Sequence, residues 1–157
     1  MPLAARDPNE TDEEREAAQA GEELPTLTAI DHVAFAVRDI YAALDTYREA
    51  FGAVVEHREE LVDDGVDVAL LKVGDGYVQL LAPTGEGSVL TPFLADRGEG
   101  LHHVGFRVDD VAAALEVLEA QGHELIDTEP RAGTRGTTVA FVHPRSMHGA
   151  LILLVEE

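Results

Sequence analysis

The chain has no cysteine, and its single lysine is Lys72. Without cysteine there are no disulfides, no thiolate nucleophiles and no zinc–thiolate centres, so any bound metal must be held by nitrogen and oxygen ligands. No apolar run approaches the roughly 18 residues that a membrane span needs, and the N-terminus lacks the basic and apolar regions of a signal peptide. We therefore expect a cytoplasmic protein with no membrane partner.

Positive charge is also scarce. Ten arginines and one lysine stand against 31 acidic residues, which gives a formal net charge of −20. Such a field repels nucleic acid and anionic membranes, so nucleic-acid binding is not expected. Two interpretations of the excess carboxylate stay open, namely adaptation to a salt-rich cytoplasm and an ordinary acidic bacterial protein.

The first residues differ from the rest of the chain. Residues 1–25 carry eight acidic and two basic residues and only two leucines, a composition that predicts a disordered acidic extension over residues 1–28. Capping-box spacing from Thr11 to Glu14 allows a short helix around residues 12–20. The remaining residues, 29–157, with 45% hydrophobic content in the whole chain, are enough for one core and one domain.

That domain contains an internal repeat. Residues 30–44 (IDHVAFAVRDIYAAL) and 101–115 (LHHVGFRVDDVAAAL) are identical at eight of fifteen positions, with an offset of 71. A repeat at fixed offset indicates a duplicated structural unit whose equivalent residues can meet across a pseudo-twofold axis. Both copies carry a histidine at the same place, His32 and His103, and two histidines that meet at such an axis could hold a metal.

Both copies predict the order βαβββ. In residues 30–37 the large apolar residues share one strand face, and His32 shares the other with Ala34 and Ala36. A helix follows Asp39, an N-cap residue, and ends at Gly52. The further strands expected in module one (residues 29–84) are 53–61, 66–73 and 77–81, separated by glycine-containing turns.

Module two (residues 100–157) repeats this order after a glycine- and proline-containing linker, 85–99, in which a short helix fits at 89–96. Its expected elements are a strand at 101–108, a helix at 111–121, and extended segments at 123–127, 137–142 and 150–156. The fold class is therefore α+β.

Several motifs in this order resemble those of the vicinal oxygen chelate superfamily, which contains glyoxalases, bleomycin-resistance proteins and dioxygenases. Within it the chain most resembles methylmalonyl-CoA epimerases, over residues 29–156. The motifs are IDHVA at 30–34, VQLLAP at 78–83, GEGLHHVGFRV at 98–108, DTEPRAG at 127–133 and FVHPR at 141–145. The resemblance implies two tandem βαβββ modules that form a cupped eight-stranded mixed sheet, with helices outside, around a divalent metal, in a homodimer.

The same resemblance implies a reaction. An epimerase of this kind removes the acidic proton between a thioester and a carboxylate, passes through an enolate that a metal can stabilise, and returns the proton on the other face. The implied metal ligands are His32, Gln79 and His103. The ion itself is undetermined among cobalt, manganese, zinc and nickel. By strand alternation His102 is expected to face away from these ligands.

Two carboxylates of the family pattern are replaced here. Leu153 stands where the last strand has its glutamate ligand, and in the GVxE motif of the third strand Val68 takes the place of glutamate. Four interpretations remain open. Water or substrate completes the metal site, Glu156 or Glu157 substitutes through a bulge or slip of the last strand, His148 serves as a base, or epimerisation has been lost. His148 and Glu157 are thus the candidate catalytic residues.

A coenzyme A ester is strongly anionic, so a chain of this charge needs local cations at its site. The candidate acyl-CoA contacts are Arg107, Arg131, Arg135 and Arg145, because guanidinium groups pair bidentately with phosphate and carboxylate. The alternative to an epimerase is a vicinal oxygen chelate protein with other metal chemistry, of glyoxalase or dioxygenase type, or a non-catalytic small-molecule-binding protein.

Overall fold

A computed structural model describes residues 24–157. Most of the expected acidic extension, including the helix expected around residues 12–20, lies outside the described residues. Within residues 24–157, no helix is long and apolar enough to cross a membrane.

Module one contains β1 (Ala29–Ala36), α2 (Ile40–Phe51), β2 (Val55–Leu61), β3 (Val66–Val73) and β4 (Gly76–Pro83), and the linker contains α3 (Leu90–Arg97). Module two contains β5 (Gly100–Arg107), α4 (Val111–Ala120), β6 (Arg131–Ala132), the 3₁₀ turn η1 (Thr134–Gly136), β7 (Thr138–Val142), the 3₁₀ turn η2 (Pro144–Met147) and β8 (Ile152–Glu156).

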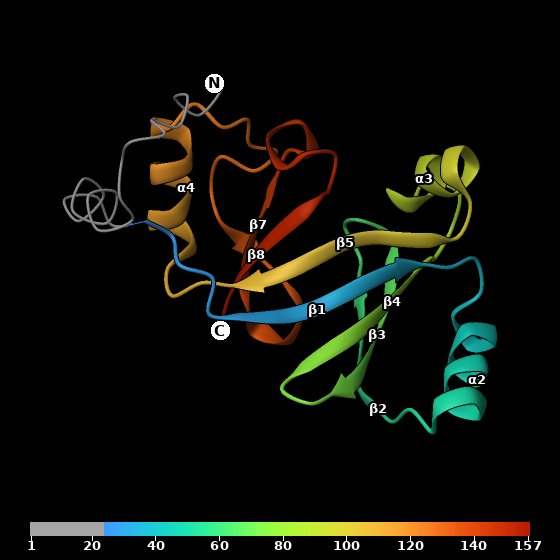
Figure 1. The fold of residues 1–157 in the computed structure, drawn as a ribbon. Helices are drawn as coiled ribbons and strands as arrows, with labels where there is room; N and C mark the ends of the chain where they lie inside the picture. Colours follow the sequence, from blue (N-terminus) through green and yellow to red (C-terminus); the bar gives the residue numbers. More distant parts are fainter. Residues whose placement is uncertain (1–23) are drawn as a thin grey trace.

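All eight strands form one mixed sheet in the order β2-β3-β4-β1-β5-β8-β7-β6. The sheet order has a twofold symmetry, because β2, β3, β4 and β1 of module one occupy the same places, counted from their edge, as β6, β7, β8 and β5 of module two. In each module the first strand pairs in parallel with the last, and the two first strands, β1 and β5, pair antiparallel at the centre. Figure 1 shows β1 and β5 side by side across the middle of the molecule, with the other strands of each module curling away on either side. The expected cupped sheet is confirmed.

The two module helices cover the outer face of the sheet, as expected. Asp39 caps α2 by accepting hydrogen bonds from the backbone N–H groups of Tyr41 and Ala42, and Gly52 ends the helix in the left-handed conformation at φ 63°. Asp110 caps α4 in the same way. One core cluster forms under each helix, and together the clusters include Ile40, Leu44, Ala69, Leu71, Leu80 and Ala82 under α2, and Val111, Leu115, Leu118, Ala140, Val142 and Leu154 under α4.

The linker helix α3 lies on the opposite, inner face of the sheet. Leu90 and Leu94 pack there against Val66, Val68 and Leu70 of β3. The inner face of module two carries a smaller apolar cluster of Val139, Leu153, Val155 and Phe141. The cup is therefore partly filled on the side of module one and more open on the side of module two.

The prediction of a strand at residues 123–127 was wrong. The structure has only an isolated bridge there, from Leu125 to Val142, and the edge strand is β6. Asp127 explains the difference, because its carboxylate accepts a hydrogen bond from the backbone N–H of Phe141 at 2.8 Å, where a strand carbonyl would otherwise bind.

Gly105 of β5 lies opposite His32 of β1, and the absence of a side chain there leaves room for the His32 ring. A Cβ atom added at Gly105 would lie 2.3 Å from Cε1 of His32, closer than any real contact. We therefore expect Gly105→Ala to lower the free energy of unfolding by about 3 kcal/mol, because the ring or the strand must shift. Urea denaturation measures this, with Gly85→Ala as the control, since a Cβ at Gly85 meets nothing within 4 Å. Equal stability of the two variants would contradict this packing.

Candidate metal and substrate site

Two histidines at equivalent places in the two modules meet at the centre of the cup. His32 of β1 and His103 of β5 point to the inner face, with only 3% and 5% of their surfaces exposed. Their Nε2 atoms are 2.9 Å apart, and the planes of the two rings are nearly perpendicular, at 89°. The repeat therefore brings its two histidines to one point.

Asp31 lies directly behind His32, although simple strand alternation would place it on the other face. The pairing of β1 with β5 shifts register between Ile30 and His32, so Asp31 is the extra residue of a β-bulge. Its carboxylate is fully buried, and Oδ2 lies 2.6 Å from Nδ1 of His32. Sequence reasoning missed this residue, because alternation alone carries no sign of a bulge.

The Asp31 carboxylate has two further cationic partners. Arg107 Nε donates to Oδ1 at 2.8 Å, and Arg135 Nη2 donates to Oδ2 at 2.9 Å. Burial alone would raise the pKa of Asp31, but hydrogen bonds from His32 and Arg107 and the charge of Arg135 outweigh it and lower the pKa to about 2. The carboxylate is therefore ionised at physiological pH.

This charge fixes the direction of one hydrogen bond at the histidines. An ionised Asp31 only accepts, so Nδ1 of His32 is the donor in the contact between them. His103 contacts a histidine through each ring nitrogen, since Nε2 lies 2.9 Å from His32 Nε2 and Nδ1 lies 2.8 Å from His102 Nδ1. Burial, followed by the charges of His32, His102 and Arg131, holds the pKa of His103 well below its usual range. His103 is therefore neutral, the form that binds a metal.

His102 does not face away from the site, which was the expectation from alternation. The register steps from Ala34 opposite His103 to Phe35 opposite Leu101, so His102 is the extra residue of a second bulge. The bulge turns its ring toward His103 and the edge of the inner face, where it also contacts Phe93 at a centroid distance of 4.8 Å. The expectation for His102 was wrong, because it assumed regular alternation.

Gln79 completes the inner face beside the histidines. Gln79 of β4 and His103 of β5 both pair with Ala34 from opposite sides, and all three side chains point inward. The amide oxygen Oε1 of Gln79 is buried and has no hydrogen-bond partner among residues 24–157. A buried oxygen without a partner is costly unless a ligand or cation satisfies it.

The residues present suit a divalent ion with three neutral ligands. Two imidazole nitrogens and one amide oxygen are donors that cobalt, manganese, zinc and nickel accept. Within residues 24–157 no three histidine, aspartate or glutamate side chains form a metal-binding group by themselves, so a set of three ligands at this place would have to include the amide. Leu153 pairs with Gly105 on the same inner face and is buried, so the fourth side is apolar.

A cavity of about 440 Å³ opens over this group between the inner faces of the two modules. Gln79, His102 and His103 contribute its polar floor, and Asp64, Asp127 and Arg131 contribute charges. Its walls are mainly apolar and include Leu61, Val66, Leu81, Leu90, Ile126, Val139, Phe141 and Leu153. Its size and lining are those of a small-molecule site.

Comparison with known proteins identifies the fold family. Residues 31–141 match the model of the glyoxalase/bleomycin resistance protein/dioxygenase superfamily. The chain belongs to this superfamily. An ethylmalonyl-CoA/methylmalonyl-CoA epimerase of Cereibacter sphaeroides is 36% identical over 80% of this chain and 95% of its own length. A mitochondrial methylmalonyl-CoA epimerase of Dictyostelium discoideum is 34% identical over 82% of this chain and 78% of its own.

A solved structure of a methylmalonyl-CoA epimerase, in complex with methylmalonyl-CoA and ammonium, superposes with a TM-score of 0.81. It is 38% identical to this chain and covers 84% of it, and the match covers 96% of that structure. The resemblance to epimerases within the superfamily is therefore confirmed in both sequence and structure.

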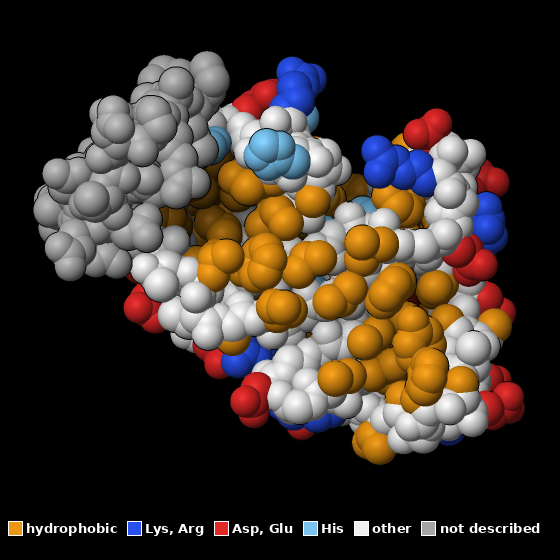
Figure 2. Space-filling view, viewed as in Figure 1, with side chains coloured by type: hydrophobic (Ala, Val, Ile, Leu, Met, Phe, Trp, Pro, Cys, Tyr) orange, Lys and Arg blue, Asp and Glu red, His pale blue; other side chains and the backbone are white. Residues whose placement is uncertain are grey.

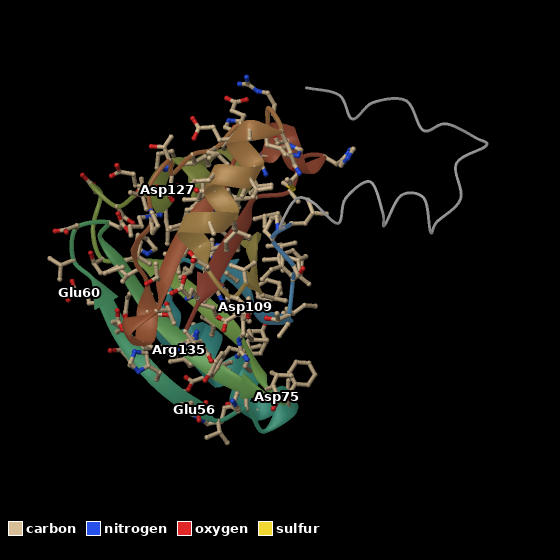
Figure 3. The ribbon with its side chains drawn as sticks, turned by 90° about the vertical axis from the view of Figure 1, so that its left-hand side faces the viewer. Glu56, Glu60, Asp75, Asp109, Asp127 and Arg135 are labelled. Carbon is tan, nitrogen blue, oxygen red and sulfur yellow. The ribbon has the colours of Figure 1, made fainter. Side chains whose placement is uncertain are left out.

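The four arginines predicted to contact an acyl-CoA lie at different places in the structure. Arg131 lines the cavity, where its guanidinium lies 5.2 Å from the centre of the Phe141 ring and pairs with Asp127 and Asp64. Arg107 and Arg135 hold Asp31 instead. Figure 3 shows Arg135 on the loop that approaches β2, the strand carrying Glu56 and Glu60, and its backbone N–H donates to Glu59 at 3.2 Å. Arg145 is 77% exposed and pairs with Glu124.

The two candidate catalytic residues do not line the cavity. His148 is exposed and ends η2 in the left-handed conformation, at φ 55°. Glu157 is also exposed and pairs with Arg107 at 3.5 Å. Glu156 accepts from the backbone N–H of Val111 at the start of α4. The last strand is regular in its pairing with β7 and β5, so neither glutamate is carried to the position of Leu153.

The Asp31 cluster predicts a stability effect that can be measured. Asp31→Asn removes the charge shared by His32, Arg107 and Arg135, and we expect it to lower the free energy of unfolding by about 3 to 5 kcal/mol at neutral pH. The lowered pKa makes this contribution complete above the ordinary value of 3.8 and lost as the pH falls through about 2. The difference between variant and parent should therefore shrink in acid.

Urea denaturation at neutral and acid pH measures that difference. Asp67→Asn is the matched control, because Asp67 pairs with Arg58 near the surface at 2.9 Å and such pairs contribute about 1 kcal/mol or less. A loss for Asp31→Asn no larger than that of the control would contradict a structural role for the cluster.

Proposed function

We propose that the chain is an epimerase of methylmalonyl-CoA or a closely related 2-carboxyacyl-CoA. The observation that carries the proposal is the buried contact of His32 with His103, because His103 and the Gln79 side chain, whose oxygen has no partner among residues 24–157, both line the cavity. The epimerase relatives, which match over four fifths of the chain, give the reaction class.

His32, Gln79 and His103 would hold a divalent metal ion, one of cobalt, manganese, zinc or nickel. When bound, the ion supplies a Lewis acid that stabilises the enolate oxygen formed on the thioester. The chain's own contribution is orientation and exclusion of water. Asp31 fixes the His32 ring, and the apolar walls surround the reacting carbon with a medium of low dielectric, in which charges interact strongly.

The substrate carboxylate would lie against Arg131, the arginine that lines the cavity. Proton removal from carbon 2 and return on the other face need a group that accepts and donates a proton. The cavity contains no glutamate among the described residues, and its carboxylates are Asp64 and Asp127. His148 and Glu157 stay predictions for this role, and both would have to approach the cavity.

The test is exchange of the proton at carbon 2 of methylmalonyl-CoA in heavy water, with and without added cobalt. We expect metal-dependent deuterium uptake, which mass spectrometry detects. His103→Ala should lower the rate by about a hundredfold or more, since it removes an essential ligand, whereas the control His123→Ala should not, because His123 is not among the residues that line the cavity. Binding without exchange under any metal would instead support the non-catalytic alternative.

The apolar fourth side of the site is tested in the same assay. Leu153→Glu restores a carboxylate on the inner face, so we expect more metal per chain by elemental analysis and faster exchange. Leu154→Glu introduces the same group one residue further, on the outer face under α4, and should give neither gain. No change in bound metal for Leu153→Glu would contradict the metal assignment.

We also propose a homodimer formed through the outer face of β1 and β5. Figure 2 shows hydrophobic side chains gathered across the face over which these strands run, and Ile30 and Leu101 are 58% and 55% exposed. An apolar band of this kind is uncommon on a monomer. Ile30→Lys should shift the sedimentation coefficient from dimer to monomer, whereas Val62→Lys, at the exposed β2–β3 turn, should not. A monomeric parent would overturn this arrangement.

The cytoplasm stays the predicted compartment.

A further inference from the structure

The loop between β6 and β7 is a compact turn with hydrogen bonds of its own. The backbone N–H of Gly133 donates to the carbonyl of Thr137 at 2.8 Å, and the N–H of Thr137 donates to the carbonyl of Thr134 at 3.0 Å. The Thr137 hydroxyl donates to the same carbonyl at 2.6 Å. Because these bonds lie within residues 131–137 (the η1 loop), they persist if the loop moves as one unit.

One side of the η1 loop is a wall of the cavity over the histidines. Residues 131–134 line this cavity of about 440 Å³, whereas the next residue, Arg135, does not. Arg131 also reaches across to Asp64 of the β2–β3 turn, at 3.6 Å. In the proposed function Arg131 contacts the substrate carboxylate, which would compete with Asp64 for this arginine. The hold of module one on the loop then depends on Arg135.

Arg135 connects the η1 loop to three strands of module one. Its backbone N–H donates to Oε1 of Glu59 on β2 at 3.2 Å. Its guanidinium lies 4.5 Å from the centre of the Tyr77 ring on β4. Its Nη2 atom donates to both carboxylate oxygens of Asp31 on β1, at 3.1 and 2.9 Å. A single residue thus holds the edge of module two against the facing edge of module one.

The closed position of Arg135 has two unfavourable features. Its φ of 58° lies in the left-handed region, which costs a residue with a Cβ more than it costs glycine. Its Nε atom is buried and has no hydrogen-bond partner among residues 24–157, a deficit that water would satisfy if the side chain were released. Strain of this kind persists where surrounding contacts impose it, and release of Arg135 relieves both features. Opening of the loop is therefore less costly than the contacts of Arg135 alone suggest.

We propose that Arg135 is a latch that holds the η1 loop against the cavity and links this closure to the orientation of His32. The link is Asp31, because its Oδ2 atom accepts from Arg135 Nη2 and also from His32 Nδ1. When the loop opens, Asp31 keeps Arg107 but loses Arg135, so the carboxylate that orients His32 is held less firmly. Arg135 is thus a positioning residue, which acts on the site through Asp31.

Hydrogen exchange measured by NMR tests the latch in the free protein. The variant is Arg135→Gly, because glycine keeps the left-handed turn and removes only the side chain. We expect the amide of residue 135, whose acceptor Glu59 lies on module one, to exchange about tenfold faster or more after correction for intrinsic rates. The amides of Gly133 and Thr137, whose acceptors lie within the loop, should keep the parent rates. The Nδ1 proton of His32 should exchange faster together with the amide of residue 135.

Two further variants complete this experiment. Arg58→Ala is the matched control, because it removes an arginine–aspartate pair, to Asp67 at 2.9 Å, that lies within module one. Its exchange at residue 135 should equal that of the parent. Arg135→Lys keeps a positive charge beside Asp31 but loses the planar guanidinium, so its rate should lie between those of the parent and Arg135→Gly. If Arg135→Gly does not fold, a parent-like rate in Arg135→Lys overturns the inference.

Methylmalonyl-CoA gives a second readout, which rests on the proposed function. Its binding should slow exchange at residue 135 of the parent by about tenfold, because contacts with residues 131–134 stabilise the closed loop. In the assay of exchange at carbon 2, Arg135→Gly should raise KM by about fivefold or more, because the closed form is less populated. Partial unfolding of the variant would instead lower kcat and leave KM unchanged.

The outcomes separate the latch from the proposed function. Equal exchange at residue 135 in Arg135→Gly and the parent overturns the latch, and unchanged exchange at His32 Nδ1 overturns its link to the site. A joint rise at Gly133, Thr137 and residue 135 also overturns the inference, because the loop then unfolds instead of lifting as a unit. If the parent neither binds methylmalonyl-CoA nor exchanges its proton, the proposed function fails alone, since the latch is measured in the free protein.

Discussion

The antiparallel pairing of β1 with β5 is the constraint on which the rest of the molecule depends. It joins the two modules into one sheet, because every other strand pairs within its own module. It also sets the two histidines of the repeat against each other, with Nε2 atoms 2.9 Å apart. The close approach requires a glycine opposite the ring of His32, and Gly105 supplies it.

This pairing is irregular at two places, and both irregularities serve the site. Asp31 is the extra residue of the bulge on β1, and His102 is the extra residue of the bulge on β5. Each is turned out of strand alternation and bonds the histidine that follows it in the chain. A chain of contacts from Asp31 through His32 and His103 to His102 results, with a buried charge at its Asp31 end. A bulge in each module thus repeats the symmetry of the fold while supplying different chemistry.

The symmetry ends at the last strand of each module. Gln79 lies on β4 with an unpartnered buried oxygen, whereas Leu153 lies on β8 in an apolar cluster with Val139 and Val155. The same sheet position is therefore polar in one module and apolar in the other. The cavity reflects this asymmetry at its floor, where Gln79 of β4 is polar and Leu153 of β8 is apolar. The side of the group formed by His32, His103 and Gln79 that faces β8 is therefore apolar.

Much of this was determined by the sequence alone. The repeat offset of 71 predicts the paired modules and the meeting of His32 with His103, because duplicated strands occupy equivalent places about a pseudo-twofold axis. Alternation predicts the inward faces of Gln79 and His103, and the caps at Asp39 and Gly52 predict where α2 begins and ends. The departure at Leu153 is also visible in the sequence, since it depends only on register within one strand.

The roles of Asp31, His102 and the arginines were decided only by the tertiary structure. A bulge depends on how two strands fit together, and neither strand records it in its own pattern. Arg107 and Arg135 look like free cations in the sequence, but they converge on Asp31 from β5 and from the η1 loop. Local patterns fix which face a side chain occupies, whereas its partners come from contacts between segments far apart in the chain.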